Sequence, residues 1–170
     1  MKLWQGWGFS KTSWKGERGE YWVLGQGLLL LAFVLVPQWQ PFSMVGWPDW
    51  IQWSRQGIAI ALGLFAAGLL GKGLIDLGPS LTPLPYPRED GQLVQTGVYG
   101  LVRHCLYSGL ILGTLAWSLW QVSLSHFAVT VALFVLLDAK ARQEEVWLMA
   151  RYSDYGDYRQ RVKKLIPWVY

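Results

Sequence analysis

A cation, an imidazole and a phenol stand together where an apolar run begins. They are Arg103, His104 and Tyr107, in the stretch GVYGLVRHCLYSG. If a helix begins near Cys105, His104 and Tyr107 share one helix face, because they are three residues apart. The free backbone N–H groups of such a first turn favour anionic groups. The alternative is that these side chains are anchors at a membrane boundary, with their polar ends in water.

A second polar cluster follows in LLDAKARQEEVW, where two cations and two carboxylates stand close together. Lys140 and Glu144 are one helical turn apart and could pair with each other, and Arg142 and Glu145 stand beside them. The alternative here is the solvated face of a long helix. Each cluster alone is therefore compatible with a purely structural role.

A short turn should bring the two clusters together. The apolar runs Leu106–Val122 and Phe127–Leu137 are separated only by a turn at 123–125, where Ser125 could cap the second helix. The two runs then form an antiparallel hairpin whose open end brings 103–107 beside 138–145. The sequence thus predicts a polar pocket suited to a small zwitterion, with a large apolar partner arriving from the lipid.

The composition is typical of a membrane protein. Apolar residues make up 52% of the chain and charged residues 15%, whereas soluble domains have about 25% charged residues. The basic residues lie mainly in the two tails, where they can anchor the protein to a membrane surface, so no nucleic-acid binding is expected.

The cysteine and histidine residues predict neither a disulfide nor a metal site. Cys105 is the single cysteine, which excludes an intramolecular disulfide. His104 and His126 lack the spacing of metal ligands, so no metal is expected.

We expect an all-α integral membrane protein with about four transmembrane helices. Two further apolar runs, Tyr21–Val36 and Ile58–Leu77, precede the hairpin, and residues 37–55 between them are expected to be a loop along the far interface. The last helix should continue past Asp138, so that the C-terminal hairpin extends into the cytoplasm over a cofactor pocket. The four prolines of residues 78–91 predict a loop that could cover this pocket.

The chain is expected to be one membrane domain, 1–170. Residues 1–77 would hold the N-terminal tail and two spans, and residues 78–170 a cofactor-binding core. Lysine and arginine number four in the N-terminal tail, three in 71–105 and seven in 139–170, against one in 37–56. By the positive-inside rule, both termini and the pocket are predicted to be cytoplasmic in a multi-pass protein.

Small residues predict close helix packing in two places. Ala59, Gly63, Ala67 and Gly71 recur every four residues, and Gly109 begins a G-x-x-x-G motif. Small side chains on one helix face let a second helix approach closely. In the apolar run Ile58–Leu77, Lys72 and Asp76 are one helical turn apart and can form an ion pair.

The order of the motifs resembles the isoprenylcysteine carboxyl methyltransferase family, to which phospholipid N-methyltransferases are related. The chain contains V-R-H-x-x-Y-x-G, then R-x-E-E-x-x-L, then Y-x-x-Y-x-x-x-V, across about its last 90 residues. Cys105 stands where the family usually has proline, and Gly100 where arginine is frequent. The matching residues are Leu93, Val94, Gly97, Tyr99, Val102, Arg103, His104, Tyr107, Gly109, Arg142, Glu144, Glu145, Leu148, Tyr155, Tyr158, Val162, Ile166 and Pro167.

This resemblance implies a site for S-adenosyl-L-methionine. A basic residue one turn before the first glutamate helps the family bind the acceptor, and here that position is Lys140, with Arg142 as a second candidate. The cofactor-binding residues that the resemblance implies are Gln92, Leu93, Val94, Tyr99, His104, Cys105, Leu106, Tyr107 and Glu144.

We therefore expect methyl transfer to a carboxylate or amine of a lipophilic small molecule, a lipid-linked substrate or a membrane lipid. The expected catalytic residues are Arg103, Arg142 and Glu145, the last as proton acceptor if the acceptor is an amine. Two alternatives stay open: an NADPH-dependent membrane reductase, and a non-catalytic membrane scaffold or assembly protein with the same fold. The sequence does not predict the oligomeric state.

Overall fold

The computed structural model describes residues 18–41, 45–82, 84–88 and 90–170. These residues form helices joined by loops, and no β-strand occurs among them. The N-terminal lysines at positions 2, 11 and 15, expected to anchor a membrane surface, lie outside these ranges. The helices are α2 (Glu20–Leu35), α3 (Asp49–Leu77), α4 (Cys105–Gln121), α5 (Leu124–Arg151) and α6 (Tyr155–Arg161), with short 3-10 helices η2 (Gly78–Ser80) and η3 (Gly97–Gly100).

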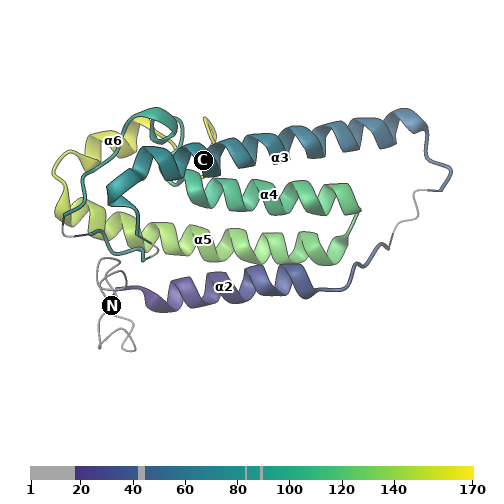
Figure 1. The fold of residues 1–170 in the computed structure, drawn as a ribbon, viewed down its shortest axis with the longest axis horizontal. Helices are drawn as coiled ribbons and strands as arrows, with labels where there is room; N and C mark the ends of the chain where they lie inside the picture. The colour runs from purple at the N-terminus through teal and green to yellow at the C-terminus, as the bar shows by residue number, and fades with distance from the viewer. Residues whose placement is uncertain (1–17, 42–44, 83, 89) are drawn as a thin grey trace.

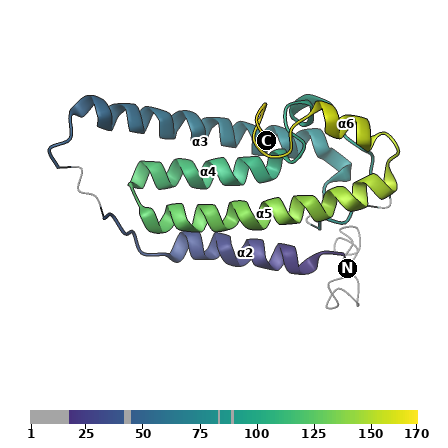
Figure 2. The ribbon, with the colours of Figure 1, turned by 180° about the vertical axis from the view of Figure 1, so that it is seen from behind.

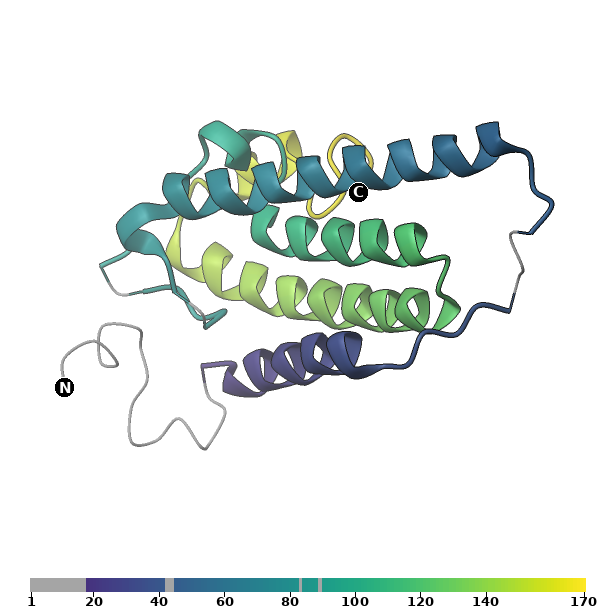
Figure 3. The same cartoon turned by 45° about the vertical axis from the view of Figure 1, so that its right-hand side comes forward.

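The four long helices α2 to α5 lie side by side and antiparallel to their chain neighbours. In Figures 1 and 2, α4 lies between α3 and α5, and α2 packs on the outer side of α5. The turned view in Figure 3 keeps the same order. Because α3 and α5 end where α4 begins, one end of the bundle collects the loop 78–104, α6 and the C-terminal tail. The predicted hairpin of 106–122 and 127–137 is therefore present as α4 and α5.

Helix α3 is longer than expected. It begins at Asp49, directly after Pro48, so the predicted loop 37–55 is helical from residue 49 onward. Proline fixes its own φ angle and disfavours the helical conformation of the residue before it, but it does not hinder a helix that follows it, and no later proline interrupts the run. Arg55 lies in this extension and donates to the carbonyl oxygens of Leu119 and Trp120 at 2.8 and 2.6 Å, which satisfies the C-terminal end of α4.

The turn between α4 and α5 is capped by a different serine from the expected one. Ser123, the N-cap residue of α5, accepts the backbone N–H of His126 through its hydroxyl group. The hydroxyl of Ser125 instead donates to the carbonyl oxygen of Pro37 at 2.6 Å. Ser125 therefore ties the segment after α2 to the turn, because at the second helical position its side chain is turned outward.

The small residues of α3 form a contact face with a different period from the predicted one. Ala59, Ala66 and Gly73 are buried, whereas Ala67 and Gly71 are exposed. A row of residues four apart drifts by about 40° per step around a helix with 3.6 residues per turn, whereas a seven-residue spacing stays near one face. The predicted close approach at Gly109 is confirmed, because a Cβ atom there would lie 3.1 Å from the carbonyl oxygen of Ala66.

Within the part of the chain that the structure describes, two helices are long and apolar enough to cross a membrane, Asp49–Ser80 and Leu124–Arg151. Helix α2 is apolar but shorter, and many of its large side chains are exposed, as are those on the outer face of α3. These surfaces suit a lipid environment. The number of spans and their orientation stay predictions.

The contact between α3 and α4 gives a test by substitution. Replacing Gly109 by valine should lower the thermal unfolding midpoint, because the new side chain meets Leu70 and the backbone of Ala66, and overpacking costs about 1–3 kcal/mol. The matched control is Gly71→Ala, where a Cβ atom meets nothing within 4 Å. Equal midpoints for the two variants would contradict the close packing.

Candidate active site

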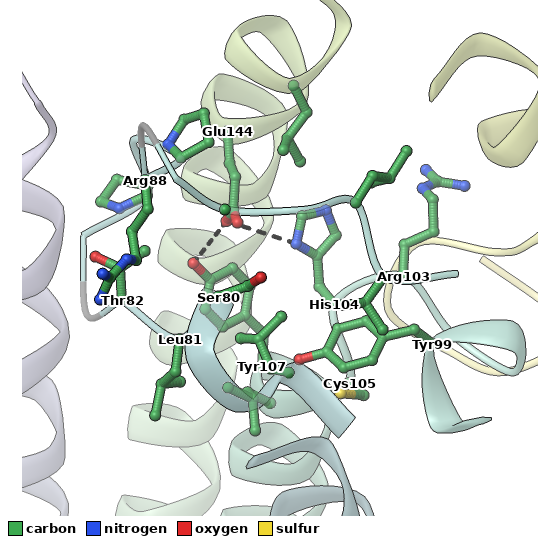
Figure 4. A pocket seen from close by; sticks show the side chains of 18 of the residues that line it. Ser80, Leu81, Thr82, Arg88, Tyr99, Arg103, His104, Cys105, Tyr107 and Glu144 are labelled. Carbon is green, nitrogen blue, oxygen red and sulfur yellow. Dashed lines mark hydrogen bonds and ion pairs between the residues drawn. The ribbon is translucent and has the colours of Figure 1, made fainter. Parts of the chain in front are cut away.

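A pocket of about 470 Å³ opens at the end of the bundle where the loop 78–104 lies. This volume is within the range of about 300–1,000 Å³ common for small-molecule sites. Figure 4 shows residues of the loop 80–88, the start of α4 and the later part of α5 around it. The loop 78–91 lines the pocket through Ser80, Leu81, Thr82, Leu84, Pro85, Pro87, Arg88 and Gly91. Its predicted place beside the pocket is therefore confirmed.

Glu144 presents a carboxylate to this pocket. Tyr107 donates its hydroxyl to Oε2 of Glu144 at 2.8 Å, and Nδ1 of His104 lies 3.6 Å from the same oxygen (dashed lines in Figure 4). The rings of His104 and Tyr107 are stacked, with centroids 5.4 Å apart and planes 7° apart. The prediction that these two residues share a face at the start of a helix is confirmed, because α4 begins at Cys105.

Glu145 points the other way and is buried. Nε and Nη2 of Arg103 donate to its Oε1 at 2.9 and 2.7 Å, and Nε2 of His104 lies 3.2 Å from the same oxygen. Arg159 adds a contact of 3.5 Å to Oε2. Consecutive residues on a helix point about 100° apart, which is why one glutamate lines the pocket and the next does not. Glu145 was predicted to accept a proton from a substrate amine, but the ring of His104 lies between its carboxylate and the pocket.

His104 thus bridges two carboxylates, one through each ring nitrogen. A neutral imidazole can donate through only one nitrogen, whereas the protonated form donates through both. Burial alone would lower the pKa of His104, but the interactions with Glu144 and Glu145 outweigh it and raise this pKa above its usual value. His104 is therefore held between the carboxylates of Glu144 and Glu145, and both carboxylates favour its protonated form.

The C-terminal tail holds the backbone of the Arg103-His104 pair. The N–H groups of Arg103 and His104 donate to the carbonyl oxygens of Lys163 and Lys164 at 2.9 and 3.1 Å. The hydroxyl of Ser108 donates to the carbonyl oxygen of Leu165 at 2.6 Å. The guanidinium of Arg103 also donates to backbone oxygens of 159 and 162. The sequence analysis found a family motif in the tail but did not predict these hydrogen bonds to Arg103, His104 and Ser108.

Tyrosines fix the loop that carries the predicted cofactor-binding residues. Tyr158 donates its hydroxyl to the carbonyl oxygen of Tyr99 at 2.6 Å, and Tyr152 donates to that of Gly91 at 2.8 Å. Burial raises the pKa of both Tyr99 and Tyr158, so each hydroxyl stays a hydrogen-bond donor at neutral pH. These bonds place 91–99 against the pocket.

The two predicted acceptor-binding cations are placed differently. Lys140 lines the pocket, where Nζ donates to Oε1 of Gln26 at 2.8 Å and lies 4.8 Å from the centre of the Tyr107 ring, instead of pairing with Glu144. Arg142 donates to Asp138 at 2.8 Å and is exposed outside the pocket. Residues two apart on a helix point in roughly opposite directions, so only one of the two can face the pocket.

Nearly all predicted site residues come together at this pocket, apart from Arg142 and Glu145. The guanidinium of Arg103 lines the pocket but is engaged by Glu145 and the tail. Sequence reasoning missed Gln26 and Arg159. The predicted residues that line the pocket are Gln92, Leu93, Val94, Tyr99, Arg103, His104, Cys105, Leu106, Tyr107, Lys140 and Glu144.

A known protein family matches the part of the chain that contains this pocket. The family described as phospholipid methyltransferase matches residues 55–155, which include most of α3, the loop 78–104, α4 and all of α5. The chain belongs to the phospholipid methyltransferase family. By this family and by its apolar helices, the protein is associated with membranes.

Three curated relatives match in sequence. The cobalt-zinc-cadmium resistance protein CzcN of Cupriavidus metallidurans is 31% identical over 61% of this chain and 49% of its own length. The nickel-cobalt-cadmium resistance protein NccN of Alcaligenes xylosoxydans is 28% identical over 68% of this chain and 54% of its own length. Delta(14)-sterol reductase TM7SF2 of Mus musculus is 37% identical over 46% of this chain and 20% of its own length. The chain thus spans about half the length of the two bacterial relatives.

The fold is similar to a solved membrane enzyme. The eukaryotic intramembrane Ras methyltransferase ICMT, an isoprenylcysteine carboxyl methyltransferase, superposes with a TM-score of 0.62 at 20% identity. The match covers 94% of this chain and 57% of that chain. At this identity the match establishes a shared fold, which includes α2 and α3.

The buried carboxylate predicts a loss of stability when its charge is removed. Glu145→Gln leaves Arg103 and His104 buried without their shared anion, and breaking a buried pair costs about 3–5 kcal/mol. Chemical denaturation in detergent measures the free energy of unfolding. Glu144→Gln is the matched control and should cost less, because its side chain is 23% exposed against 5% for Glu145. The reverse order would overturn this assignment.

The raised pKa of His104 predicts a pH-dependent stability. Because folding raises this pKa above the reference value of 6.5, its contribution is full below pH 6.5 and is lost as the pH rises through the folded-state value. Unfolding midpoints of the wild type, measured at several pH values above 6, should fall relative to those of His104→Gln. Parallel curves for the two proteins would show that His104 is not protonated in the folded state.

Proposed function

We propose that the protein is an S-adenosyl-L-methionine-dependent methyltransferase that acts on a lipophilic acceptor at the membrane. The observation that carries this proposal is Glu144, held by Tyr107 and His104 at the start of α4 and facing the pocket within the region matched to the family. When bound, the cofactor supplies a methyl group on a positively charged sulfur.

The lining residues suit the polar groups of this cofactor. The carboxylate of Glu144 accepts from an ammonium or from ribose hydroxyls, and its exposure to the pocket leaves lone pairs free for that purpose. The first backbone N–H groups of α4 are positioned to donate to a carboxylate, as helix starts commonly do. Gln92, Leu93 and Val94 also line the pocket.

The acceptor is proposed to lie nearer Lys140. Its cationic Nζ attracts an anionic group, and a carboxylate is already ionised at neutral pH, so methyl transfer to it needs no base. An amine would need one, and Glu145 is engaged by Arg103 and His104. The protein then contributes mainly alignment in a pocket shielded from water. In this assignment Arg103 and Glu145 are positioning residues.

The apolar part of the acceptor has a matching surface. Leu70 and Leu74 of α3 and Leu106 and Leu110 of α4 line the pocket. A long hydrocarbon chain could enter between these helices. The positive-inside rule places this reaction on the cytoplasmic side.

A reductase is the second candidate, because a sterol reductase matches part of the chain. A 2′-phosphate of NADPH would call for a cluster of free arginines. The two arginines that line the pocket, Arg88 and Arg103, are paired with Asp90 and Glu145. This pairing favours the methyltransferase.

Calorimetric titration of the detergent-purified protein tests the proposal. S-adenosyl-L-methionine should bind to the wild type, and binding should fall by at least about tenfold in His104→Ala and Glu144→Ala, because each loses a contact to a charged group. NADPH is titrated in parallel. Binding of NADPH alone would favour the reductase. If folded protein binds neither ligand, both enzymatic functions are contradicted and a non-catalytic scaffold is favoured.

A further inference from the structure

A single amide side chain interrupts the apolar sequence of α2. From Val23 to Leu35 the helix reads VLGQGLLLLAFVL, in which Gln26 stands between two glycines. A polar group in an apolar setting is costly unless it is hydrogen-bonded. Gly25 lets α2 approach α5 closely, because a Cβ atom there would lie 2.9 Å from a methyl carbon of Leu136. The helix is thus shaped to bring this amide to α5.

The partner of Gln26 is the buried ammonium of Lys140. Nζ donates to the amide oxygen at 2.8 Å and lies over the ring of Tyr107. Lys140 is only 2% exposed, so the amide and the ring replace much of the water that an ammonium needs. Gln26 and Tyr107 together keep Nζ on the α2 side of the pocket, apart from Glu144.

The orientation of the amide follows from this bond. An ammonium has donors but no acceptor, so the oxygen of Gln26 must face it and the NH₂ group must turn elsewhere. Gln26 lines the pocket, and its amide nitrogen has no partner within the described part of the chain. The pocket therefore offers N–H donors and the cation of Lys140 beside the Tyr107 ring, and the carboxylate of Glu144 at the hydroxyl of the same tyrosine.

We propose that Gln26 is a positioning and binding residue for the acceptor. It holds Lys140 in place and, with its own N–H groups, completes a site on α2 and α5 for an oxyanion on a long-chain lipid. This assignment rests on the proposed function, because it places the acceptor, and not the cofactor, at this end. It predicts that an anionic head group is preferred to a neutral or cationic one on the same chain.

Binding of radiolabelled palmitate to the detergent-purified full chain tests this site, with hexadecanol and hexadecylamine as competitors. The wild type should bind palmitate, and neither competitor should displace it at equal concentration. Gln26→Leu should weaken palmitate binding by about tenfold, as expected for lost hydrogen bonds to a charged group. Its affinity for S-adenosyl-L-methionine should stay within about twofold of the wild type, because Gln26 contacts Lys140 and not Glu144, the residue proposed to hold the cofactor.

Three further variants separate the roles of Gln26. Gln26→Glu still accepts from Lys140 but loses the N–H donors, so it should fold normally and bind palmitate weakly. The double variant Gln26→Leu/Lys140→Met is compared with the single variant Lys140→Met. The loss of palmitate affinity between them should be smaller than the loss that Gln26→Leu causes in the wild type, because part of the effect of Gln26 passes through Lys140. The matched control is Gln38→Leu, which removes a hydrogen bond from the segment after α2 to the carbonyl oxygen of Gln121, at the far end of the bundle, and should leave binding of both ligands unchanged.

Several outcomes would overturn this assignment. They are unchanged palmitate binding in Gln26→Leu, equal loss of palmitate and S-adenosyl-L-methionine in that variant, or a wild type that does not distinguish palmitate from hexadecanol. Failure of the proposed function has a different signature, namely a wild type that binds palmitate selectively but does not bind S-adenosyl-L-methionine.

Discussion

The site depends on one buried arrangement, a histidine held between two neighbouring glutamates. His104 meets Glu144 with one nitrogen and Glu145 with the other. Glu145 accepts hydrogen bonds from Arg103 on the side away from the pocket, and the carboxylate of Glu144 faces the pocket. Because successive helix residues diverge by about 100°, a pair of adjacent glutamates is a simple way to separate a supporting carboxylate from one that faces a ligand. The rest of the bundle brings α4 and α5 to the spacing that this arrangement needs.

Much of the fold was predictable because it follows from local signals. The short turn before Leu124 requires an antiparallel hairpin, and the prolines of 78–91 exclude a helix there. The shared face of His104 and Tyr107 follows from helical spacing alone. Errors arose where a local pattern left two choices, as with the cap of α5 and the start of α3. The four-residue period on α3 was misleading because a helix has 3.6 residues per turn.

The remaining features depend on contacts that sequence spacing does not encode. Arg142 and Glu145 belong to the matching motif, yet the direction of each side chain depends on the rotation of α5 against its neighbours. The contact of Arg103 with the tail joins residues about 60 positions apart. Gln26 is an intermediate case, because a lone amide in an apolar helix is visible in the sequence but its partner is not.

The parallel pairing of Val102 with Lys163 has a consequence for how the protein is made. The helices α2 to α5 all precede residue 152, so they can form while the tail is still being synthesised. The hydrogen bonds to Arg103 and His104 cannot form until residues 163–165 have left the ribosome. A product that stops before residue 163 would keep its apolar helices but lack the backbone support of Arg103 and His104.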